Sequence, residues 1–233
     1  MKKPLIFLLF FICCNSSFAQ EVNTKKLLEQ FHTQPDKREQ SISQLRTYYL
    51  ANSRDSLFYI GNLALNKGIE DDDFSLMTLG KLVLSSYYNK VGKMELSRTY
   101  LHQCIPYYKR KEDFALLADA ENQMGISYFN SNNNPKAIEY FVKSLETSKN
   151  LPPDNESFVG QLNLAEVYLR DELYDLAEAE ALTYLERVKK LNFQNATRNA
   201  YDLLGKINVA KNNLEVGYNY YQKSLLLTLK GNV

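Results

Sequence analysis

The segments Met124-Gly125-Ile126-Ser127-Tyr128 and Ala137-Ile138-Glu139-Tyr140-Phe141 form the centre of the stretch from Asp119 to Ser148. In the first segment an aromatic residue follows a small residue after three positions, and in the second after four. Steps of three and four place side chains on one face of a helix. Between the two segments, Asn134-Pro135 is a helix cap followed by proline at the first helical position. The stretch therefore predicts two helices joined by a short turn.

The same pattern recurs every 40 residues along the chain. The small position of the first helix is Leu45, Ser85, Gly125, Ala165 and Gly205, and the aromatic three residues later is Tyr48, Tyr88, Tyr128 and Tyr168, with Asn208 in the last copy. The turn carries Asn52, Gly92, Asn132, Glu172 and Asn212. Four of these five are residue types that tolerate the left-handed conformation that ends many helices.

The second helix has three repeated columns, spaced by four residues and expected to share one buried face. They are Leu57, Ser97, Ala137, Ala177 and Gly217; Gly61, Leu101, Phe141, Ala181 and Tyr221; and Leu65, Ile105, Leu145, Leu185 and Leu225. A helix with a single apolar face is not stable alone, so neighbouring hairpins are expected to stack and share a core.

This pattern resembles the tetratricopeptide repeat (TPR), although a standard TPR has a period of about 34 residues. The resemblance implies an all-α fold: a right-handed superhelical solenoid of five helix-turn-helix units at about 38–77, 78–117, 118–157, 158–197 and 198–233. A short N-terminal capping helix and linker are expected within 20–36. The longer period is similar to that of the arrays of kinesin light chain and of peptide-sensing bacterial regulators.

The first 19 residues are typical of a secretory signal peptide. Basic Lys2 and Lys3 precede the apolar run Leu5 to Ile12, and Ser17-Phe18-Ala19 supplies the small-residue end. We expect cleavage near Ala19 and a periplasmic or secreted product, with no membrane span in the mature chain. The end of the segment resembles signal peptides of Bacteroidota. The alternatives are a retained anchor, for which the apolar run is short, and a lipoprotein acylated at Cys13 or Cys14, for which the preceding residues are bulky.

Charge and cysteine content restrict the classes of function. Without residues 1–19 the chain has 26 basic and 27 acidic residues, a net charge of −1. Such a balance provides no electrostatic reason to bind nucleic acid. Cys104 is the one cysteine left after cleavage, so no intrachain disulfide is expected.

No group of residues predicts catalysis, and we expect no cofactor, no metal site and no enzyme activity, with a hydrolase as the weakest competing hypothesis. His32 and His102 lie in different elements without metal-ligand spacing. Cys104 shares a column with Ala64, Ser144, Tyr184 and Ser224, which favours a packed core thiol. The basic run Lys109-Arg110-Lys111 is favoured as the end of a helix over a nucleic-acid patch.

The resemblance also implies where a partner binds, because the first helices of a TPR array line its concave surface. Residues carried onto that surface by position are Arg46, Tyr49, Asn89, Asn122, Phe129, Glu166, Arg170 and Lys206. The apolar members of the same columns, Ile126, Leu169 and Val209, have packing as an equal alternative. The cations that hold a terminal carboxylate in co-chaperone TPRs are missing, so an extended peptide or a helix of another protein is the expected ligand.

The last predicted helix differs from the others at its end. Internal copies read Asn66-Lys67-Gly68-Ile69 and Glu146-Thr147-Ser148-Lys149, whereas the last reads Leu226-Leu227-Thr228-Leu229. Since a terminal repeat needs a polar outer face, Leu226, Leu227 and Leu229 predict docking on a second copy of the chain, a partner or a further segment. The alternative is that these leucines fold back on the fifth hairpin.

The sequence therefore predicts a non-catalytic protein- or peptide-binding scaffold that acts through its concave face in the periplasm or outside the cell. The alternative hypothesis is a stand-alone or truncated sensory TPR module of a signalling or transcription-regulating system.

Overall fold

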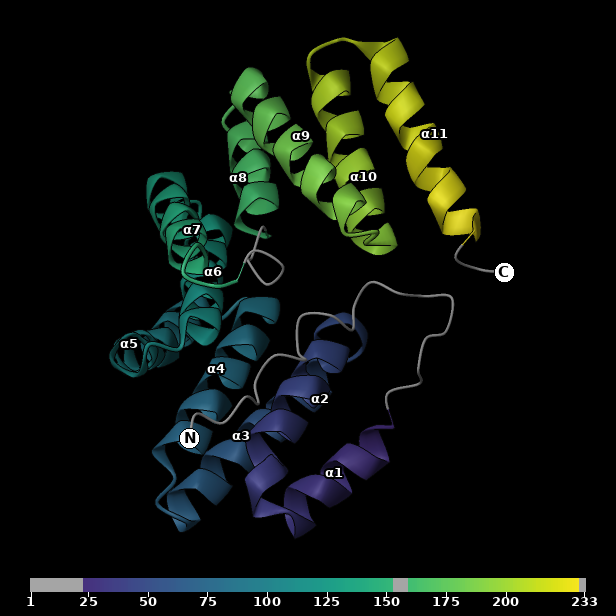
Figure 1. Cartoon of the computed structure of the whole chain (residues 1–233). Coiled ribbons are helices and arrows are strands. Elements are labelled where there is room, and N and C mark those ends of the chain that lie inside the picture. The colour runs from purple at the N-terminus through teal and green to yellow at the C-terminus, as the bar shows by residue number, and fades with distance from the viewer. Residues whose placement is uncertain (1–22, 153–158, 231–233) are drawn as a thin grey trace. The chain divides into compact units, whose positions relative to one another are not determined.

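The computed structural model describes residues 23–152 and 159–230, and these are all-α, as predicted (Figure 1). A 3₁₀-helical turn, η1 (Pro35–Lys37), follows the first helix. The helices are α1 (Thr24–Thr33), α2 (Arg38–Asn52), α3 (Arg54–Glu70), α4 (Phe74–Lys90), α5 (Met94–Lys111), α6 (Phe114–Asn130), α7 (Asn134–Ser148), α8 (Val159–Arg170), α9 (Tyr174–Lys190), α10 (Gln194–Ala210) and α11 (Leu214–Lys230). The expected signal peptide, residues 1–19, lies outside these ranges. In the described part of the chain, no helix has both the length and the apolar character needed to cross a membrane.

The helices form consecutive hairpins that follow the predicted 40-residue spacing. The pairs are α2–α3, α4–α5, α6–α7, α8–α9 and α10–α11, and the two helices of each pair pack together. The helices α4, α6 and α10 begin at Phe74, Phe114 and Gln194 and each contain 17 residues. In each hairpin the even-numbered helix is called the first helix and the odd-numbered one the second helix below.

A left-handed residue ends most of the helices, at intervals of 20 residues except for one interval of 40. Positive φ occurs at Asp72, Gly92, Glu112, Asn132, Glu172, Asn192 and Asn212. At each of these turns the residue after it donates its N–H to a carbonyl five residues earlier, as in Lys93 to Tyr88 and Asn133 to Tyr128, both at 2.9 Å. This is the Schellman bond that satisfies the last carbonyls of a helix. Turns within and between hairpins are thus built alike.

One turn prediction was wrong, and one turn forms at its predicted position with an unfavourable residue type. Asn52 is the last helical residue of α2, and the chain turns at extended Ser53, whose side chain caps α3. Glu172 adopts φ 60° although its residue type rarely does. The helix-ending hydrogen bonds of the repeated turn hold Glu172 there, including that from Leu173 N–H to Tyr168 at 2.9 Å.

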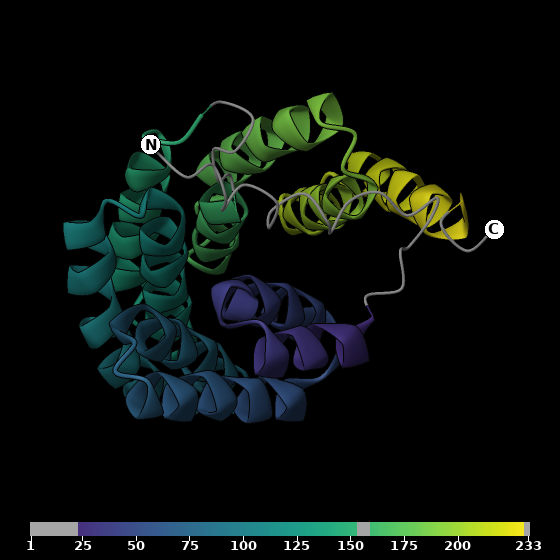
Figure 2. The same cartoon turned by 60° about the horizontal axis from the view of Figure 1, so that its bottom comes forward.

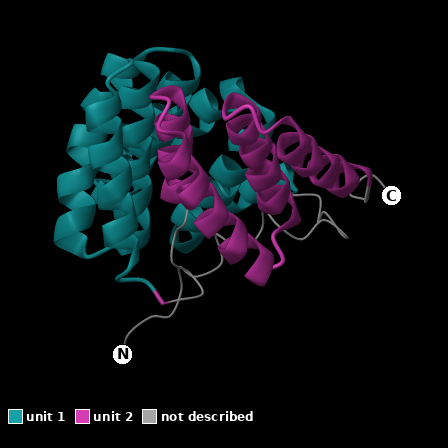
Figure 3. Cartoon of the chain, turned by 90° about the horizontal axis from the view of Figure 1, so that it is seen from above, with its two compact units in different colours: residues 1–10, 20–151 teal, residues 11–19, 152–233 magenta. Residues whose placement is uncertain are grey.

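The chain divides into two compact units between Leu151 and Pro152 (Figure 3). Pro152 stands 20 residues after Asn132, where the other turns carry a left-handed residue. Because the proline ring holds φ near about −65°, Pro152 cannot form the same turn. The helices accordingly fall into two groups: unit 1 contains α1 to α7, and unit 2 contains α8 to α11.

Each unit has its own buried apolar core. In unit 1 one cluster contains Ile42, Ile60 and Leu79, and a second contains Leu101, Leu117 and Met124. Phe31 of α1 joins the first cluster, so α1 packs on α2. In unit 2 the cluster contains Ala181, Val188, Leu203 and Ile207. Figures 1 and 2 show α10 between α9 and α11, and α10 contacts both.

One predicted core column is displaced by one residue. The buried position is Ala64, Cys104, Ser144, Tyr184 and Ser224, whereas the predicted column is buried at Leu185, half-buried at Leu65, Ile105 and Leu145 and exposed at Leu225. Seven residues turn a helix by about 700°, within about 20° of two full turns, but eight residues pass them by about 80°. Steps of four and then three keep the buried face narrower than two steps of four.

Within each unit the first helices lie closer to one another than the second helices do. In unit 1, α2 contacts α4 and α4 contacts α6; in unit 2, α8 contacts α10. Among the described residues, the second helices of successive hairpins make no such contact with one another. A stack that curves brings its inner helices closer together than its outer ones, so the first helices line the inner side within each unit.

Candidate functional site: the first-helix surfaces

The residues predicted for the partner-binding surface fall into three groups. Arg46, Asn89 and Asn122 in unit 1 are buried, and between 6% and 9% of the surface of each residue is exposed to solvent. Tyr49 and Phe129 are half-buried. Glu166, Arg170 and Lys206 in unit 2 are exposed. The structure therefore brings the predicted residues together as two separate sets, one in each unit.

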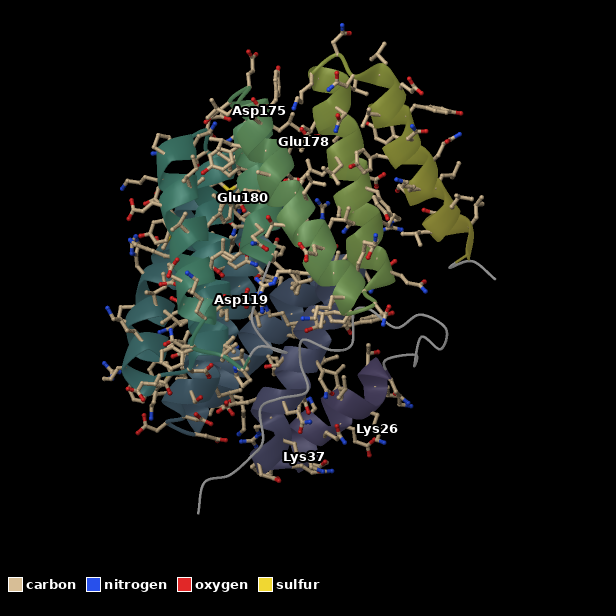
Figure 4. All side chains as sticks on the ribbon, turned by 45° about the horizontal axis from the view of Figure 1, so that its top comes forward. Lys26, Lys37, Asp119, Asp175, Glu178 and Glu180 are labelled. Carbon is tan, nitrogen blue, oxygen red and sulfur yellow. The ribbon has the colours of Figure 1, made fainter. Side chains whose placement is uncertain are left out.

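Arg46 links three successive first helices of unit 1. From α2, its Nη2 donates to Ser86 Oγ of α4 at 3.0 Å, and its Nη1 donates to Asp119 Oδ2 of α6 at 2.5 Å. Figure 4 shows Asp119 on α6. The Nε of Arg46 is buried and has no hydrogen-bond partner. The guanidinium and the carboxylate are both mostly buried, so this ion pair is shielded from water and holds the first three hairpins together.

Asn89 forms a second connection between first helices. Its Nδ2 donates to the backbone carbonyl of Gln123 at 3.0 Å and to Gln123 Oε1 at 3.1 Å, while its buried Oδ1 has no partner. Thus α4 and α6 are joined through an amide that is closed off by its neighbours. The inner side of unit 1 is a polar network satisfied mostly by the protein itself.

Second helices also reach forward to the next hairpin. Arg98 of α5 donates from Nη1 to Ser127 Oγ and Ser131 Oγ of α6, both at 3.0 Å. It also pairs with Glu95 and lies 4.9 Å from the ring centre of Tyr128. In unit 2 the equivalent position is Glu178 of α9 (Figure 4). Glu178 accepts from Lys211 Nζ at 2.6 Å and from Asn208 Nδ2 of α10 at 3.0 Å.

These connections follow from the repeat, yet the pattern of residue types does not predict them. Arg98 and Ser131 are 33 residues apart, as are Glu178 and Lys211. Their residue types differ between copies, so no repeated residue marks the contact. The detectable signal is the spacing alone, which joins a second helix to the end of the next first helix.

The buried sulfur and phenol of unit 1 are unsuited to catalysis. Burial raises the pKa of the Cys104 thiol to about 12, and its Sγ lies 3.5 Å from the carbonyl of Thr78. Burial also raises the pKa of Tyr108 well above its usual value, and its hydroxyl has no partner. Because the thiolate is the reactive form, Cys104 is a packed thiol, as its column predicted. Within residues 23–152 and 159–230, no group of three His, Cys, Asp or Glu residues is placed to hold a metal ion.

The first helices of unit 2 present a different surface. Glu166 of α8 and Lys206 of α10 occupy the same repeat position, and Val209 of α10 is 44% exposed. Partial desolvation by the surrounding protein raises the pKa of the Glu166 carboxyl group, and the positive charge of Lys206 opposes this rise. Desolvation lowers the pKa of Arg170, and Asp171 opposes it. Opposite charges and an apolar side chain thus lie on neighbouring helices and are open to solvent.

The chain is similar in fold to a solved helical protein, the crystal structure of BtubC (BKLC) from P. vanneervenii. The two share 14% sequence identity with a TM-score of 0.68, and the match covers 90% of this chain and 88% of that one. At this identity the likeness shows the fold alone. No protein-family model matches the chain. Among curated proteins, no match was found either.

Proposed function

We propose that this protein is a non-catalytic scaffold of the TPR class that binds a peptide or a segment of another protein. The observation that carries the proposal is the contrast between its two first-helix surfaces. In unit 1 the column of Arg46 and Ser86 is buried and bonded within the chain. In unit 2 the same column, Glu166 and Lys206, is exposed beside Val209. We therefore propose α8 and α10 as the binding surface.

The chemistry of this surface suits a short segment of mixed charge. Glu166 attracts a basic side chain, while Lys206 attracts an acidic side chain or a backbone carbonyl. Val209 and half-buried Leu169 offer apolar contact at one repeat position. Interfaces of this kind combine an apolar centre with a charged rim, and the charges set orientation and partner choice.

The site of action in this proposal is the periplasm or the outside of the cell. It is supported by the order of basic, apolar and small residues from Met1 to Ala19. A partner is accordingly sought among exported proteins.

The test is affinity capture from a periplasmic extract with the purified protein as bait. A variant with Glu166→Ala, Lys206→Ala and Val209→Ser is expected to lose a protein band that the unchanged chain captures, since each substitution removes an exposed contact without disturbing the core. The matched control is Glu186→Ala with Lys190→Ala and Leu182→Ser, three exposed positions on the second helix α9. Retention of every band by the first-helix variant, or equal loss by the control, contradicts the proposal.

A further inference from the structure

Within each unit, every second helix that precedes another hairpin, namely α3, α5 and α9, carries one face that binds the next first helix. We call it the joining face and define it on α9 by residues Tyr174, Glu178, Ala181, Leu185 and Lys189. Glu178 bonds Lys211 and Asn208 beside α10, and Ala181 and Leu185 belong to the cluster shared with α10. The equivalent residues of the other helices behave alike: Arg98 of α5 bonds Ser131, and the ring of Phe58 of α3 lies 5.0 Å from that of Tyr87 of α4.

The joining face of α11 consists of the large apolar residues Leu214, Tyr218, Tyr221, Leu225 and Leu229. Steps of four, three, four and four keep these residues within a sector of about 80° around the helix. They are 60%, 62%, 37%, 58% and 57% exposed, respectively. At the position of Leu225, Leu65 and Ile105 are half-buried and Leu185 is 8% exposed, each with a following hairpin, whereas Leu225 is 58% exposed. At the position of Leu229 the contrast is absent, since Ile69 is 61% exposed although α4 follows. In unit 2, α11 contacts α10 and no later described helix covers it.

The pattern of charge on this face differs from that on the other joining faces. Where α5 has Arg98 and Lys109 and α9 has Glu178 and Lys189, α11 has Tyr218 and Leu229. Arg98 and Glu178 bond polar groups of the next hairpin, whereas the joining face of α11 carries no charge. Its occupant is therefore an uncharged, apolar helix face.

A second copy of the chain could cover the α11 face with one of its first helices or with its own α11. Head-to-tail stacking would place a first helix of another copy on α11. In α2 that face is covered by α1 through Phe31, and in α8 the equivalent residues Leu164 and Val167 are buried. The α11 face itself remains open and uncharged. It also matches itself when two copies run antiparallel: about a midpoint between Tyr221 and Gln222, Leu214 stands opposite Leu229 and Tyr218 opposite Leu225.

We propose that α11 binds α11 of a second copy in antiparallel orientation, which makes the protein a two-fold dimer. The area is adequate for this. With about 200 Å² for a fully exposed large side chain, the five residues and neighbouring Leu226 expose on the order of 600 Å². A standard interface buries about 800 Å² per partner, and the polar residues that flank the face, such as Glu215 and Gln222, supply the difference. Closed two-fold pairing is also the commonest form of self-association.

Sedimentation equilibrium over a hundredfold range of concentration tests the proposal. The unchanged protein is expected to have twice the chain mass, and the variant Leu225→Glu with Leu229→Glu the mass of one chain. Leu182→Glu places the same charge on an exposed leucine of α9 outside its joining face and is expected to remain dimeric. Circular dichroism checks that all three proteins are equally helical. A monomeric unchanged protein, a dimeric double variant or a monomeric Leu182→Glu protein would each overturn the proposal.

A cross-linking experiment tests the orientation. In the antiparallel pair the two copies of Gln222 lie near the two-fold axis on the same side, so Gln222→Cys is expected to give a covalent dimer with a short bismaleimide. Leu182→Cys is expected to give none, and the unchanged protein serves as the blank for the chain's own cysteines, Cys13, Cys14 and buried Cys104. Equal cross-linking at positions 222 and 182, or none at position 222, would overturn the antiparallel arrangement.

Discussion

At the residue scale, Arg46 shows that a side chain placed on the inner side of a helical array can act in stability rather than recognition. Its guanidinium reaches past Ser86 of α4 to Asp119 of α6, and the ion pair is largely shielded from solvent. Burial strengthens the attraction between the two charges but costs the free energy of removing both from water. Removing one member therefore mainly measures the cost of leaving the other charge buried without a partner.

Replacing Arg46 by Met is expected to lower the free energy of unfolding by about 3 kcal/mol, because the Asp119 carboxylate stays buried without its partner. The double variant Arg46→Met with Asp119→Leu should recover much of this loss, since no charge is left unpaired. Urea unfolding followed by circular dichroism measures both. Equal stability of the Arg46→Met protein and the unchanged protein would show that water reaches Asp119.

The contact between Lys211, Asp175 and Glu178 makes a prediction about pH. Its hydrogen bonds raise the pKa of Lys211 to about 12 and lower the pKa values of Asp175 and Glu178. The lysine's contribution is present below its unfolded pKa and is lost as the pH rises toward about 12. The two carboxylates stabilise the folded protein above their unfolded pKa values, about 4. This stabilisation is lost as the pH falls through their lower pKa values in the folded protein.

The variant Lys211→Met is therefore expected to melt below the unchanged protein by a constant margin between about pH 6 and pH 9. The margin should shrink as the pH is lowered toward 3 and as it is raised toward 12. Thermal unfolding across this range provides the measurement. A margin that does not vary with pH would mean that the lysine acts through packing alone.

At the scale of elements, close helix contact and turn geometry place different demands on glycine. A Cβ on Gly80 of α4 would lie 2.6 Å from the backbone nitrogen of Leu65 and 2.8 Å from the carbonyl oxygen of Gly61, both in α3. Gly92 has open space around it but a φ of 78°. The first glycine is required by the neighbouring backbone and the second by its own conformation.

Gly80→Ala is expected to destabilise the protein by about 1–3 kcal/mol, the usual effect of overpacking, because α3 and α4 must separate. Gly92→Asn should be nearly neutral, since Asn132 and Asn212 occupy the same turn position with φ near 60°. Thermal unfolding of the two variants side by side tests this. A larger loss for Gly92→Asn would reverse the assignment of the two glycines.

At the scale of the whole molecule, the division between Leu151 and Pro152 separates two cores. In unit 1 the clusters lie among α1 to α6, and in unit 2 the cluster lies among α8 to α10 and extends to α11. Repeat arrays gain stability from contacts between neighbours, so a local change spreads along one stack through shared clusters.

We expect Gly80→Ala to speed amide hydrogen exchange in α3, α4 and α5, whose contacts it disturbs, and to leave exchange in α9 and α10 unchanged. Mass spectrometry of peptic fragments measures this exchange. The matched change in unit 2 is Gly205→Ala, where a Cβ would lie 2.6 Å from the ring of Tyr221, and it should have the reverse effect. Faster exchange in both units from either variant would show that they unfold as one.

The sequence by itself determined the repeat. The pattern of Gly125, Tyr128, Ala137 and Phe141 recurs every 40 residues, and this recurrence predicted the helices, their pairing into hairpins and the small residues at their crossings. These features depend on local periodicity and on the size of single side chains. It also pointed to the exposed leucines of the last helix, since position in the repeat implies burial.

The tertiary structure alone decided which inner residues remain open to a partner. Arg46 and Glu166 occupy the same repeat position, yet one is buried against Asp119 and the other is exposed, because a side chain's partners come from helices 33 to 73 residues away. The same holds for the one-residue shift of the core column and for left-handed Glu172. Exposure and hydrogen bonding depend on what neighbouring helices place at each position, and a repeat pattern does not contain that information.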